Sequence, residues 1–217
     1  MNVKRVLSGK ANLDERFAAN YDELLTAISA IRATGHTISM TQGVYDLLHT
    51  GHTRYLEAAK SYGDFLLVAV DTDAYTKRRK GSDNERRPIV PFEERIEILS
   101  QVRSVDILTY RDLKEHEGDP DFVIKLVKPD VLVMSHSTKD ISESKYEEIR
   151  NMLSEWSGKL ELLEPKDTVS TTGRIRDLFI DGSVGFAEHI TEVVQKGIDE
   201  YFTRAGRTFV HKGRGGQ

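Results

Sequence analysis

The chain has 217 residues, 38% of them hydrophobic, and this length suits one α/β domain with extensions better than two domains. Its formal net charge of −4 provides no overall positive field, so we do not expect a dedicated nucleic-acid-binding protein. The absence of cysteine excludes disulfides and thiolate catalysis. Because no apolar run approaches the roughly 20 residues of a membrane helix and no signal-peptide core is present, we expect a cytoplasmic protein that does not bind membranes.

The N-terminal region contains one predicted helix behind an arm. Residues 1–11 carry basic side chains and show no periodic pattern. Apolar residues then recur at spacings of three and four up to about Ala33, which indicates an amphipathic helix that begins at Asn12 or Asn20 and ends at Gly35. We expect this helix to be structural.

The next segment combines a strand, a glycine-containing turn and a helix. Residues 37–41 have the composition of a strand, and a helical pattern follows His49 and His52. The two histidines therefore fall at the start of a helix, where unpaired N–H groups and the macrodipole attract anions. Gly51 lets a phosphate approach the main chain, and both imidazoles can reach it. From this pattern alone, a zinc half-site or a solvated polar surface remains the alternative.

Four further strands are predicted, with helical patterns between them. These strands are expected at residues 65–70, 107–110, 130–134 and 160–163. Residues 71–90 read as a long polar connection, and Pro91 opens the helix that follows it. The alternation of strands and helices predicts an α/β fold with a doubly wound, five-stranded parallel sheet, in which ligands bind at the carboxyl ends of the strands.

The C-terminal part contains a hydroxyl-rich segment and one more helix. Residues 170–172 precede an apolar helix, so their hydroxyl groups can either cap that helix or bind a phosphate at its N-terminus. Beyond residue 182, apolar residues at helical spacing predict a helix that serves packing or a subunit contact, and a basic tail follows it. We therefore divide the chain into a domain at 1–182, which includes the N-terminal arm and helix, and a helical extension with the tail at 183–217.

Two of these segments together resemble a known family. The string Thr41-x-Gly-x-x-Asp46-x-x-His49-x-Gly-His52 is similar to the first signature of the cytidylyltransferase-like nucleotidyltransferases. The run Val169-Ser-Thr-Thr is similar to their second signature. The resemblance covers most of the chain, and it implies a Rossmann-like nucleotidyltransferase fold with strand order 3-2-1-4-5 and added helices at both ends.

Within this family, two segments look most like one kind of enzyme. Residues 68–81 and 87–95 are similar to the adenylyltransferase domain that makes ADP-heptose from heptose 1-phosphate. The chain departs from the heptose enzymes after the fourth strand, where Ser135-His-Ser stands in place of the usual Gly-Gly-Asp. The identity of the acceptor therefore stays open.

The resemblance implies three groups of site residues. The expected catalytic residues are His49, His52 and Lys77. The expected nucleotide-binding residues are Gly43, Tyr45, Asp46, Gly51, Ser135, Ser170, Thr171 and Thr172. The expected substrate-binding residues are Asp73, Lys80, Arg87 and Arg95. Taken alone, the charge run from Lys77 to Lys80 would more simply form a solvated loop.

The resemblance also implies a reaction, in which a nucleoside monophosphate passes from an NTP to a phosphorylated small molecule and pyrophosphate is released. ATP is favoured over CTP, because Pro165-Lys-Asp-Thr stands where cytidylyltransferases usually have Arg-Thr-x-Gly. A sugar phosphate is favoured as the acceptor, because the local resemblance is to the heptose enzyme. We expect Mg²⁺ bound mainly through the nucleotide phosphates, no metal site built from protein ligands, and a homodimer. The alternatives are a CTP-dependent enzyme acting on glycerol 3-phosphate or a similar alcohol phosphate, and a non-catalytic nucleotide-binding module.

Overall fold

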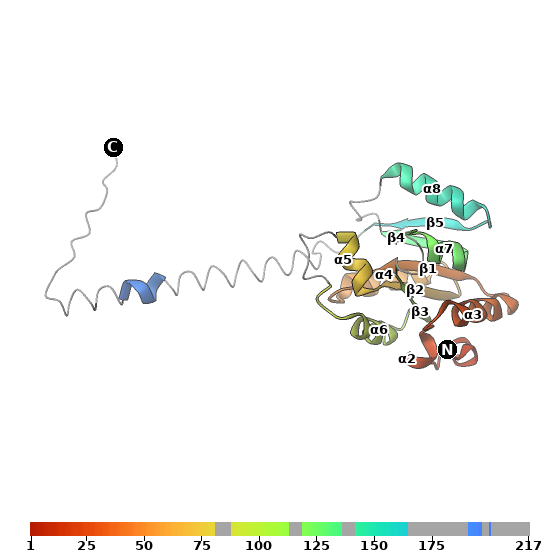
Figure 1. Ribbon diagram of the computed structural model, residues 1–217. Helices are drawn as coiled ribbons and strands as arrows, with labels where there is room; N and C mark the ends of the chain where they lie inside the picture. The colour runs from red at the N-terminus through yellow and green to blue at the C-terminus, as the bar shows by residue number, and fades with distance from the viewer. Residues whose placement is uncertain (81–87, 113–118, 136–141, 165–190, 197–199, 201–217) are drawn as a thin grey trace. The chain divides into compact units, whose positions relative to one another are not determined.

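Five parallel strands form one sheet in the computed structural model (Figure 1). They are β1 (Ile38–Gly43), β2 (Phe65–Asp71), β3 (Ile107–Arg111), β4 (Val131–Ser135) and β5 (Lys159–Leu163). Their order across the sheet is β3-β2-β1-β4-β5, which confirms the doubly wound fold and the strand order expected from the sequence. The structure describes residues 1–80, 88–112, 119–135, 142–164, 191–196 and 200.

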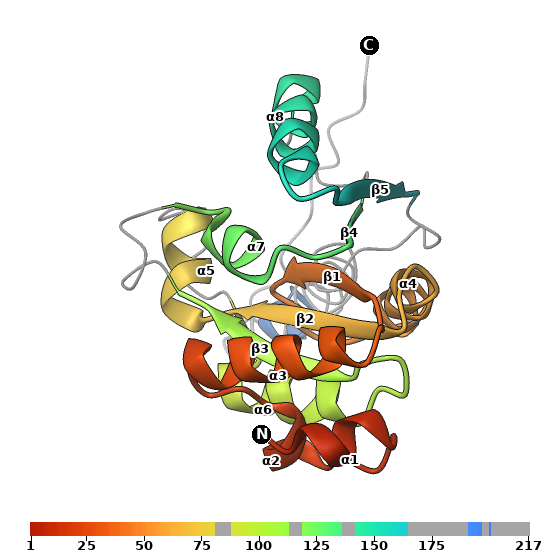
Figure 2. The same cartoon turned by 90° about the vertical axis from the view of Figure 1, so that its right-hand side faces the viewer.

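Helices cover both faces of this sheet. They are α1 (Val3–Leu7), α2 (Leu13–Arg16), α3 (Tyr21–Ala33), α4 (Thr50–Lys60), α5 (Asp73–Lys80), α6 (Phe92–Ser100), α7 (Phe122–Val127) and α8 (Glu143–Ser154). One hydrophobic core packs α3, α7 and α8 against one face, and a second core packs α4 and α6 against the other (Figure 2). This division between two faces is the arrangement that right-handed crossovers produce in a doubly wound sheet.

The central strands are built for burial on both faces. All seven residues of β2 are buried, which is the environment that its continuous apolar run predicts. Gly63 allows the turn before β2 to pass close to β1, because a Cβ at this position would lie 2.5 Å from the main-chain nitrogen of Ser39. The carboxyl ends of the paired strands meet at one edge of the sheet, and the site described below lies there.

The N-terminal residues form two short helices that the periodicity did not indicate. Asn12 and Glu15 make a reciprocal capping box on α2, and the side chain of Asn20 caps α3. Both candidate starts of the predicted helix are therefore real, but they belong to separate helices. Phe17 forms an isolated bridge with Leu108 of β3, so this segment covers part of the edge of the sheet.

The segment that follows β2 corrects one expectation. Residues 71–90 read as a polar connection, whereas part of this stretch forms α5. The Thr72 hydroxyl oxygen accepts a hydrogen bond from the N–H of Tyr75 (3.2 Å), and Tyr75 and Thr76 are buried. The helix has mostly charged side chains, so it lacks the apolar periodicity by which helices are recognised in sequences.

The chain divides into two units, Met1–Thr168 and Val169–Gln217. In the second unit, residues 191–196 are helical, in agreement with the apolar spacing there. The domain boundary that we placed at residue 182 and the helix expected after residue 172 lie outside the described residues, so this assignment remains a prediction. None of the helices in the part of the chain that the structure describes is long and apolar enough to cross a membrane.

Candidate active site

The loop between β1 and α4 has an uncommon backbone conformation. Tyr45 and Leu47 have positive φ angles of 54° and 48°, a left-handed conformation that is rare outside glycine. Such residues cost about 1–3 kcal/mol each and persist only where their surroundings hold them. The Tyr45 ring is buried, and a Cβ at Gly43 would approach it to 3.3 Å. The loop is held in a shape that brings His49 to the start of α4.

Each of the two histidines accepts a hydrogen bond at the start of α4. His49 is the N-cap residue, and its Nδ1 accepts a hydrogen bond from the N–H of Gly51 (3.1 Å). The N–H of His49 donates in turn to Nδ1 of His52 (3.3 Å). The two imidazoles thus reproduce the reciprocal pattern of a capping box, in which a serine or threonine and a glutamate are the usual partners.

These hydrogen bonds determine the tautomer of both imidazoles. A neutral imidazole has one donor and one acceptor nitrogen, so an accepting Nδ1 places the hydrogen on Nε2. The two ring centroids are 4.1 Å apart, with 36° between the ring planes. His49 and His52 therefore provide two neighbouring N–H donors beside the positive end of a helix. This arrangement suits the oxygens of a phosphate group.

A chain of buried hydroxyl groups joins the start of the site to the sheet. The hydroxyl of Tyr45 donates to Oγ1 of Thr41 (3.4 Å). Oγ1 of Thr41 lies 2.7 Å from the hydroxyl of Tyr55, which donates to the carbonyl of Val133 (2.9 Å). Burial raises the pKa of Tyr55 to about 12 and that of Tyr45 well above its ordinary value. Both phenols are therefore neutral near pH 7, and they connect α4 with β1 and β4.

Asp46 connects the histidine-bearing loop to the segment before α6. Its carboxylate accepts hydrogen bonds from the N–H of Ile89 (3.1 Å) and the N–H of Val90 (3.0 Å). The Asp46 side chain is buried, so these two donors compensate for lost contact with water. The sequence places Asp46 in the nucleotide site, and the structure gives it a role in holding the loop.

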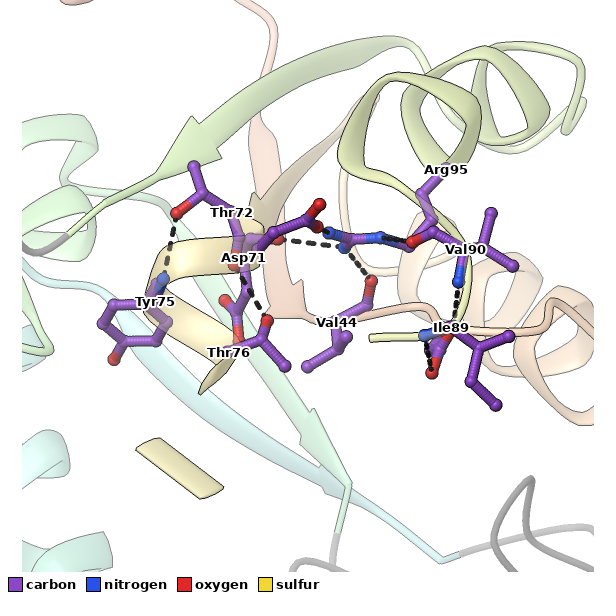
Figure 3. Close-up of polar contacts among 10 residues, drawn as sticks. Val44, Asp71, Thr72, Tyr75, Thr76, Ile89, Val90 and Arg95 are labelled. Carbon is purple, nitrogen blue, oxygen red and sulfur yellow. Dashed lines mark hydrogen bonds and ion pairs between the residues drawn. The ribbon is translucent and has the colours of Figure 1, made fainter. Parts of the chain in front are cut away.

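Arg95 binds the same loop from the other side (Figure 3). Its guanidinium donates to the carbonyl groups of Val44, Asp71 (2.9 Å) and Val90 (2.9 Å). It also forms an ion pair with Oδ1 of Asp73 (2.6 Å). We expected Arg95 to contact the substrate, but its side chain is 1% exposed and these four contacts all lie within the protein. We therefore assign it a positioning role, in which it fixes the loops after β1 and β2.

The α5 helix carries the basic residues expected near the phosphates. Lys77 is exposed on this helix, and Lys80 is its last residue. Asp73 is the first residue of α5 and is partly exposed while paired with Arg95. The helix starts directly after the carboxyl end of β2, so it belongs to the same edge of the sheet as the histidines.

The remaining expected residues lie on the other half of the sheet or outside the described residues. Ser135 is the last residue of β4, the strand next to β1, so it occupies the predicted edge. The structure does not describe the positions of Arg87, Ser170, Thr171 and Thr172. Their roles remain predictions.

Sequence reasoning missed a buried ion pair at the same edge. Asp71 and Arg111 are the last residues of β2 and β3 and pair in register. Nε of Arg111 donates to Oδ1 of Asp71 (2.7 Å), and the guanidinium lies over the ring of Tyr75, 4.6 Å from its centroid. The sequence did contain a signal for this pair, because Asp71 and Arg111 each follow directly after an apolar run that predicts a strand.

The acidic and imidazole side chains do not form a metal cage in the part of the chain that the structure describes. No group of three or more His, Cys, Asp or Glu side chains that could hold a metal ion is present among those residues. Mg²⁺ commonly binds through substrate phosphates and water with one or two carboxylates.

The parallel sheet, its strand order and the paired histidine donors define a domain of the nucleotidyltransferase class. The family model described as cytidylyltransferase-like matches residues 40–177. This match covers more than half of the chain and includes both signature segments. The chain belongs to the cytidylyltransferase-like family.

Curated relatives support this assignment. The chain is 36% identical over 162 residues to the bifunctional protein HldE of Escherichia coli O1:K1 / APEC, an alignment that covers 74% of this chain and 31% of that protein. It is 39% identical over 158 residues to bifunctional protein HldE of Citrobacter koseri, covering 72% and 30% of the two chains. The aligned part of the chain thus spans about a third of the length of these relatives.

Solved structures also show similarity. The lipopolysaccharide core biosynthesis protein from Thermoplasma volcanium GSS1 is 26% identical with a TM-score of 0.49, over 62% of this chain and 100% of that chain. Pantothenate synthetase from Thermus thermophilus is 15% identical with a TM-score of 0.47, over 69% of this chain and 60% of that chain.

Proposed function

We propose that the protein transfers the adenylyl group of ATP to a sugar phosphate and releases pyrophosphate. The observation that carries this proposal is the pair of histidines whose Nε2–H donors stand beside the start of α4. Family membership supports the class of reaction. The resemblance of residues 68–81 and 87–95 to heptose-1-phosphate adenylyltransferases supports the choice of ATP and of a sugar phosphate.

The chemistry is a direct displacement at the α-phosphorus of the nucleotide. An oxygen of the acceptor phosphate forms a new P–O bond, and the bond between the α-phosphorus and the bridging oxygen breaks, with its electron pair leaving on pyrophosphate. The acceptor phosphate is already ionised near pH 7, so no general base is required. Negative charge shifts toward the leaving pyrophosphate, so positioned donors and cations provide most of the stabilisation.

The residues of the site divide these tasks. The Nε2–H groups of His49 and His52 donate to oxygens of the α- and β-phosphates, because their Nδ1 atoms are committed to main-chain N–H groups. Lys77 bridges the acceptor phosphate and the nucleotide, and the hydroxyl groups of residues 170–172 hold the β/γ end. Mg²⁺ bound to the triphosphate supplies further neutralisation of its charge.

The proposal also includes the nucleotide preference, the localisation and the oligomeric state of the protein. The Pro165-Lys-Asp-Thr segment lacks the arginine that usually precedes the second signature in cytidylyltransferases, so ATP is expected to bind more tightly than CTP. We also propose that the protein acts in the cytoplasm as a homodimer.

Pyrophosphate release tests the proposal. The purified protein is incubated with each of the four NTPs and a panel of sugar phosphates and alcohol phosphates, and the highest rate is expected with ATP and a sugar phosphate.

His52→Ala is expected to lower kcat on the order of a hundredfold, because a transition-state contact is lost while the fold remains. His36→Ala is the matched control, since His36 is exposed and precedes β1 at the opposite end of the strand. A preference for CTP would make the protein a cytidylyltransferase, and nucleotide binding without turnover would make it a binding module.

A further inference from the structure

The sheet face that packs against α3, α7 and α8 changes from apolar to polar toward its carboxyl edge. One row of residues in register across β1, β2 and β3 is entirely apolar and consists of Met40, Leu67 and Ile107. The next row on the same face, two residues further along each strand, consists of Gln42, Ala69 and Thr109. Because side chains alternate between the two faces of a strand, Gln42 and Thr109 flank the small side chain of Ala69.

Both polar side chains of this row have a buried oxygen that lacks a hydrogen-bond partner. Within the described structure, neither Oε1 of Gln42 nor Oγ1 of Thr109 makes a hydrogen bond. Thr109 is fully buried and Gln42 is partly exposed, so the row reaches from the surface into the interior. More than nine in ten buried polar groups in proteins are satisfied, so each of these oxygens requires a partner from outside the described protein, either ordered water or a bound molecule.

The next row on this face lies at the carboxyl ends of β2 and β3 and contains two opposite charges that neutralise each other. It contains the ion pair between Asp71 and Arg111, whose Nη2 to Oδ1 distance is 2.6 Å. Arg111 also donates to the carbonyl of Pro120 (3.4 Å) and lies over the Tyr75 ring. Since its guanidinium is already bound to a carboxylate, Arg111 does not offer an unpaired positive charge to a second phosphate.

The chemistry of the two oxygens selects the kind of group that they can bind. An amide oxygen accepts hydrogen bonds, so its partner must carry a hydrogen, and a threonine hydroxyl can donate as well as accept. A fully ionised phosphate has no hydrogen to donate, whereas an alcohol hydroxyl both donates and accepts. We propose that Gln42 and Thr109 bind hydroxyl groups of the sugar portion of the acceptor.

This inference rests on the proposed function and specifies how the acceptor is oriented. Gly43, which follows Gln42 at the end of β1, leads directly into the loop that carries His49. The phosphate of the acceptor lies toward the histidines and Lys77, and its hydroxyl-bearing carbons lie along the row of Gln42 and Thr109. The site then prefers a polyhydroxylated phosphate over a short alcohol phosphate, because each unmatched buried oxygen reduces binding.

Calorimetry of the full chain tests this orientation without requiring turnover. The probes are a hexose 1-phosphate, a heptose 1-phosphate, their singly deoxygenated analogues and glycerol 3-phosphate, each titrated in the absence of nucleotide. Thr109→Val removes the hydroxyl at nearly constant shape, and Thr109→Ser retains a hydroxyl. Thr26→Val is the matched control, because Thr26 is an exposed residue of α3 whose hydroxyl donates to the carbonyl of Asp22. Gln42→Met provides a second variant if Thr109→Val does not fold.

A chemical double-mutant cycle gives the expected result. Thr109→Val is expected to weaken binding of the sugar phosphate about tenfold, the scale of one hydrogen bond to a buried group, and Thr109→Ser and Thr26→Val are expected to change it less than about twofold. In wild type, one deoxygenated analogue should bind more weakly than its parent compound. In Thr109→Val, the same analogue and its parent compound should bind with equal affinity, because the hydroxyl that distinguishes them has lost its partner. The melting temperature of the unliganded Thr109→Val protein should be equal to or above that of wild type, because a buried oxygen without a partner is removed.

Three outcomes separate this inference from the proposed function. Equal affinity of wild type, Thr109→Val and Gln42→Met for every sugar phosphate would overturn the inference and leave ordered water as the partner of both oxygens. Failure of every sugar phosphate to bind would overturn it as well. Weakened binding in the variants with no pyrophosphate release by wild type would support the inference and contradict the proposed transferase reaction.

Discussion

His49 and His52 cap α4 through Nδ1, and we propose that the same side chains bind phosphate oxygens through Nε2–H. Serine and asparagine are good N-cap residues, so capping alone does not require an imidazole. The choice of histidine at both positions adds a donor on the far side of each ring. The residue pattern therefore carries information about chemistry as well as about the start of a helix.

Substitutions at His49 can separate capping from catalysis. His49→Asn is expected to keep the melting temperature close to wild type, because asparagine caps a helix well, while kcat falls on the order of a hundredfold. His49→Ala is expected to lose both the helix cap and the catalytic donor, so its kcat falls as well and its free energy of unfolding is lower by about 1 kcal/mol. Urea unfolding and steady-state kinetics on the two variants check this. A catalytically intact His49→Asn protein would show that the imidazole serves only as a cap.

Lys77 is exposed, so its replacement is expected to affect chemistry more than stability. If it bridges the two substrates, Lys77→Ala should raise the acceptor KM or lower kcat far more than it weakens nucleotide binding. The measurement is a pair of kinetic titrations, one for each substrate, with calorimetry of the nucleotide alone. Arg54→Ala, an exposed cation of α4, is the matched control. Equal losses for nucleotide and acceptor would place Lys77 on the triphosphate.

At the scale of secondary-structure elements, Arg95 of α6 connects the loop after β1 with the end of β2 and the start of α5. Three of its acceptors are main-chain carbonyl groups, which no substitution at the partner positions can remove. The planar guanidinium reaches acceptors in several directions, and a lysine ammonium cannot reproduce that geometry. Arg95 thus determines the relative position of segments that carry Asp46, Asp73 and the histidines.

Arg95→Lys tests this connection. It should lower the free energy of unfolding by about 2–4 kcal/mol, because several buried acceptors lose their donor. Arg32→Lys is the control, since Arg32 also donates to a main-chain carbonyl, that of Val127 (3.1 Å), but lies near the surface; a loss below about 1 kcal/mol is expected there. Chemical denaturation gives both values. Equal stability of Arg95→Lys and wild type would contradict the positioning role.

Tyr55 gives the connection between α4 and the sheet a defined pH dependence. Its pKa is raised to about 12, chiefly by burial, whereas a tyrosine in the unfolded chain ionises near 10. A raised folded-state pKa means that this contribution to stability is fully present below about pH 10 and is lost as pH rises toward 12.

Tyr55→Phe should therefore be less stable than wild type by about 1 kcal/mol at pH 7, because the hydroxyl bonds to Thr41 and Val133 are lost. The difference in the free energy of unfolding between the two proteins should shrink above pH 10. Urea titrations between pH 7 and 11 measure this difference, and the same titrations on Tyr45→Phe and on the double variant separate the contribution of Tyr45, whose pKa is raised by burial and also by Tyr55. A difference independent of pH would show that Tyr55 ionises in the folded protein as it does in the unfolded chain.

At the scale of the whole molecule, the two ends of the chain belong to different units. The N-terminal segment adds α1 and α2 and pairs Phe17 with β3, an edge strand. The C-terminal unit contains a helical stretch whose Val193 and Val194 are 54% and 53% exposed. We expect the contact between subunits of the proposed homodimer to include these two adjacent apolar side chains.

The expected homodimer can be tested at these two residues. Sedimentation velocity of wild type should show a dimer, and the double change Val193→Glu/Val194→Glu should convert it to a monomer with an unchanged melting temperature of the central domain, because two charges would be buried without partners. Lys196→Glu, in the same helical stretch, is the charge-changing control. A wild-type monomer would contradict the expectation, and a dimer in the double variant would place the interface elsewhere.

The sequence by itself determined the elements that have local signals. Continuous apolar runs located the buried strands, and the strand-turn-helix pattern located His49 and His52 at a helix start. The family resemblance added the order of the strands. The helix α5 escaped detection because few of its positions are apolar, so periodicity gave no signal.

Only the tertiary structure decided which polar groups meet. Arg95 bonds to Val44, 51 positions away, and Arg111 to Asp71, 40 positions away. The row of Gln42 and Thr109 exists only because strand pairing brings β1, β2 and β3 into register. Periodicity reports the burial of one element at a time, whereas hydrogen-bond partners and unmatched buried oxygens depend on segments that are distant in the chain.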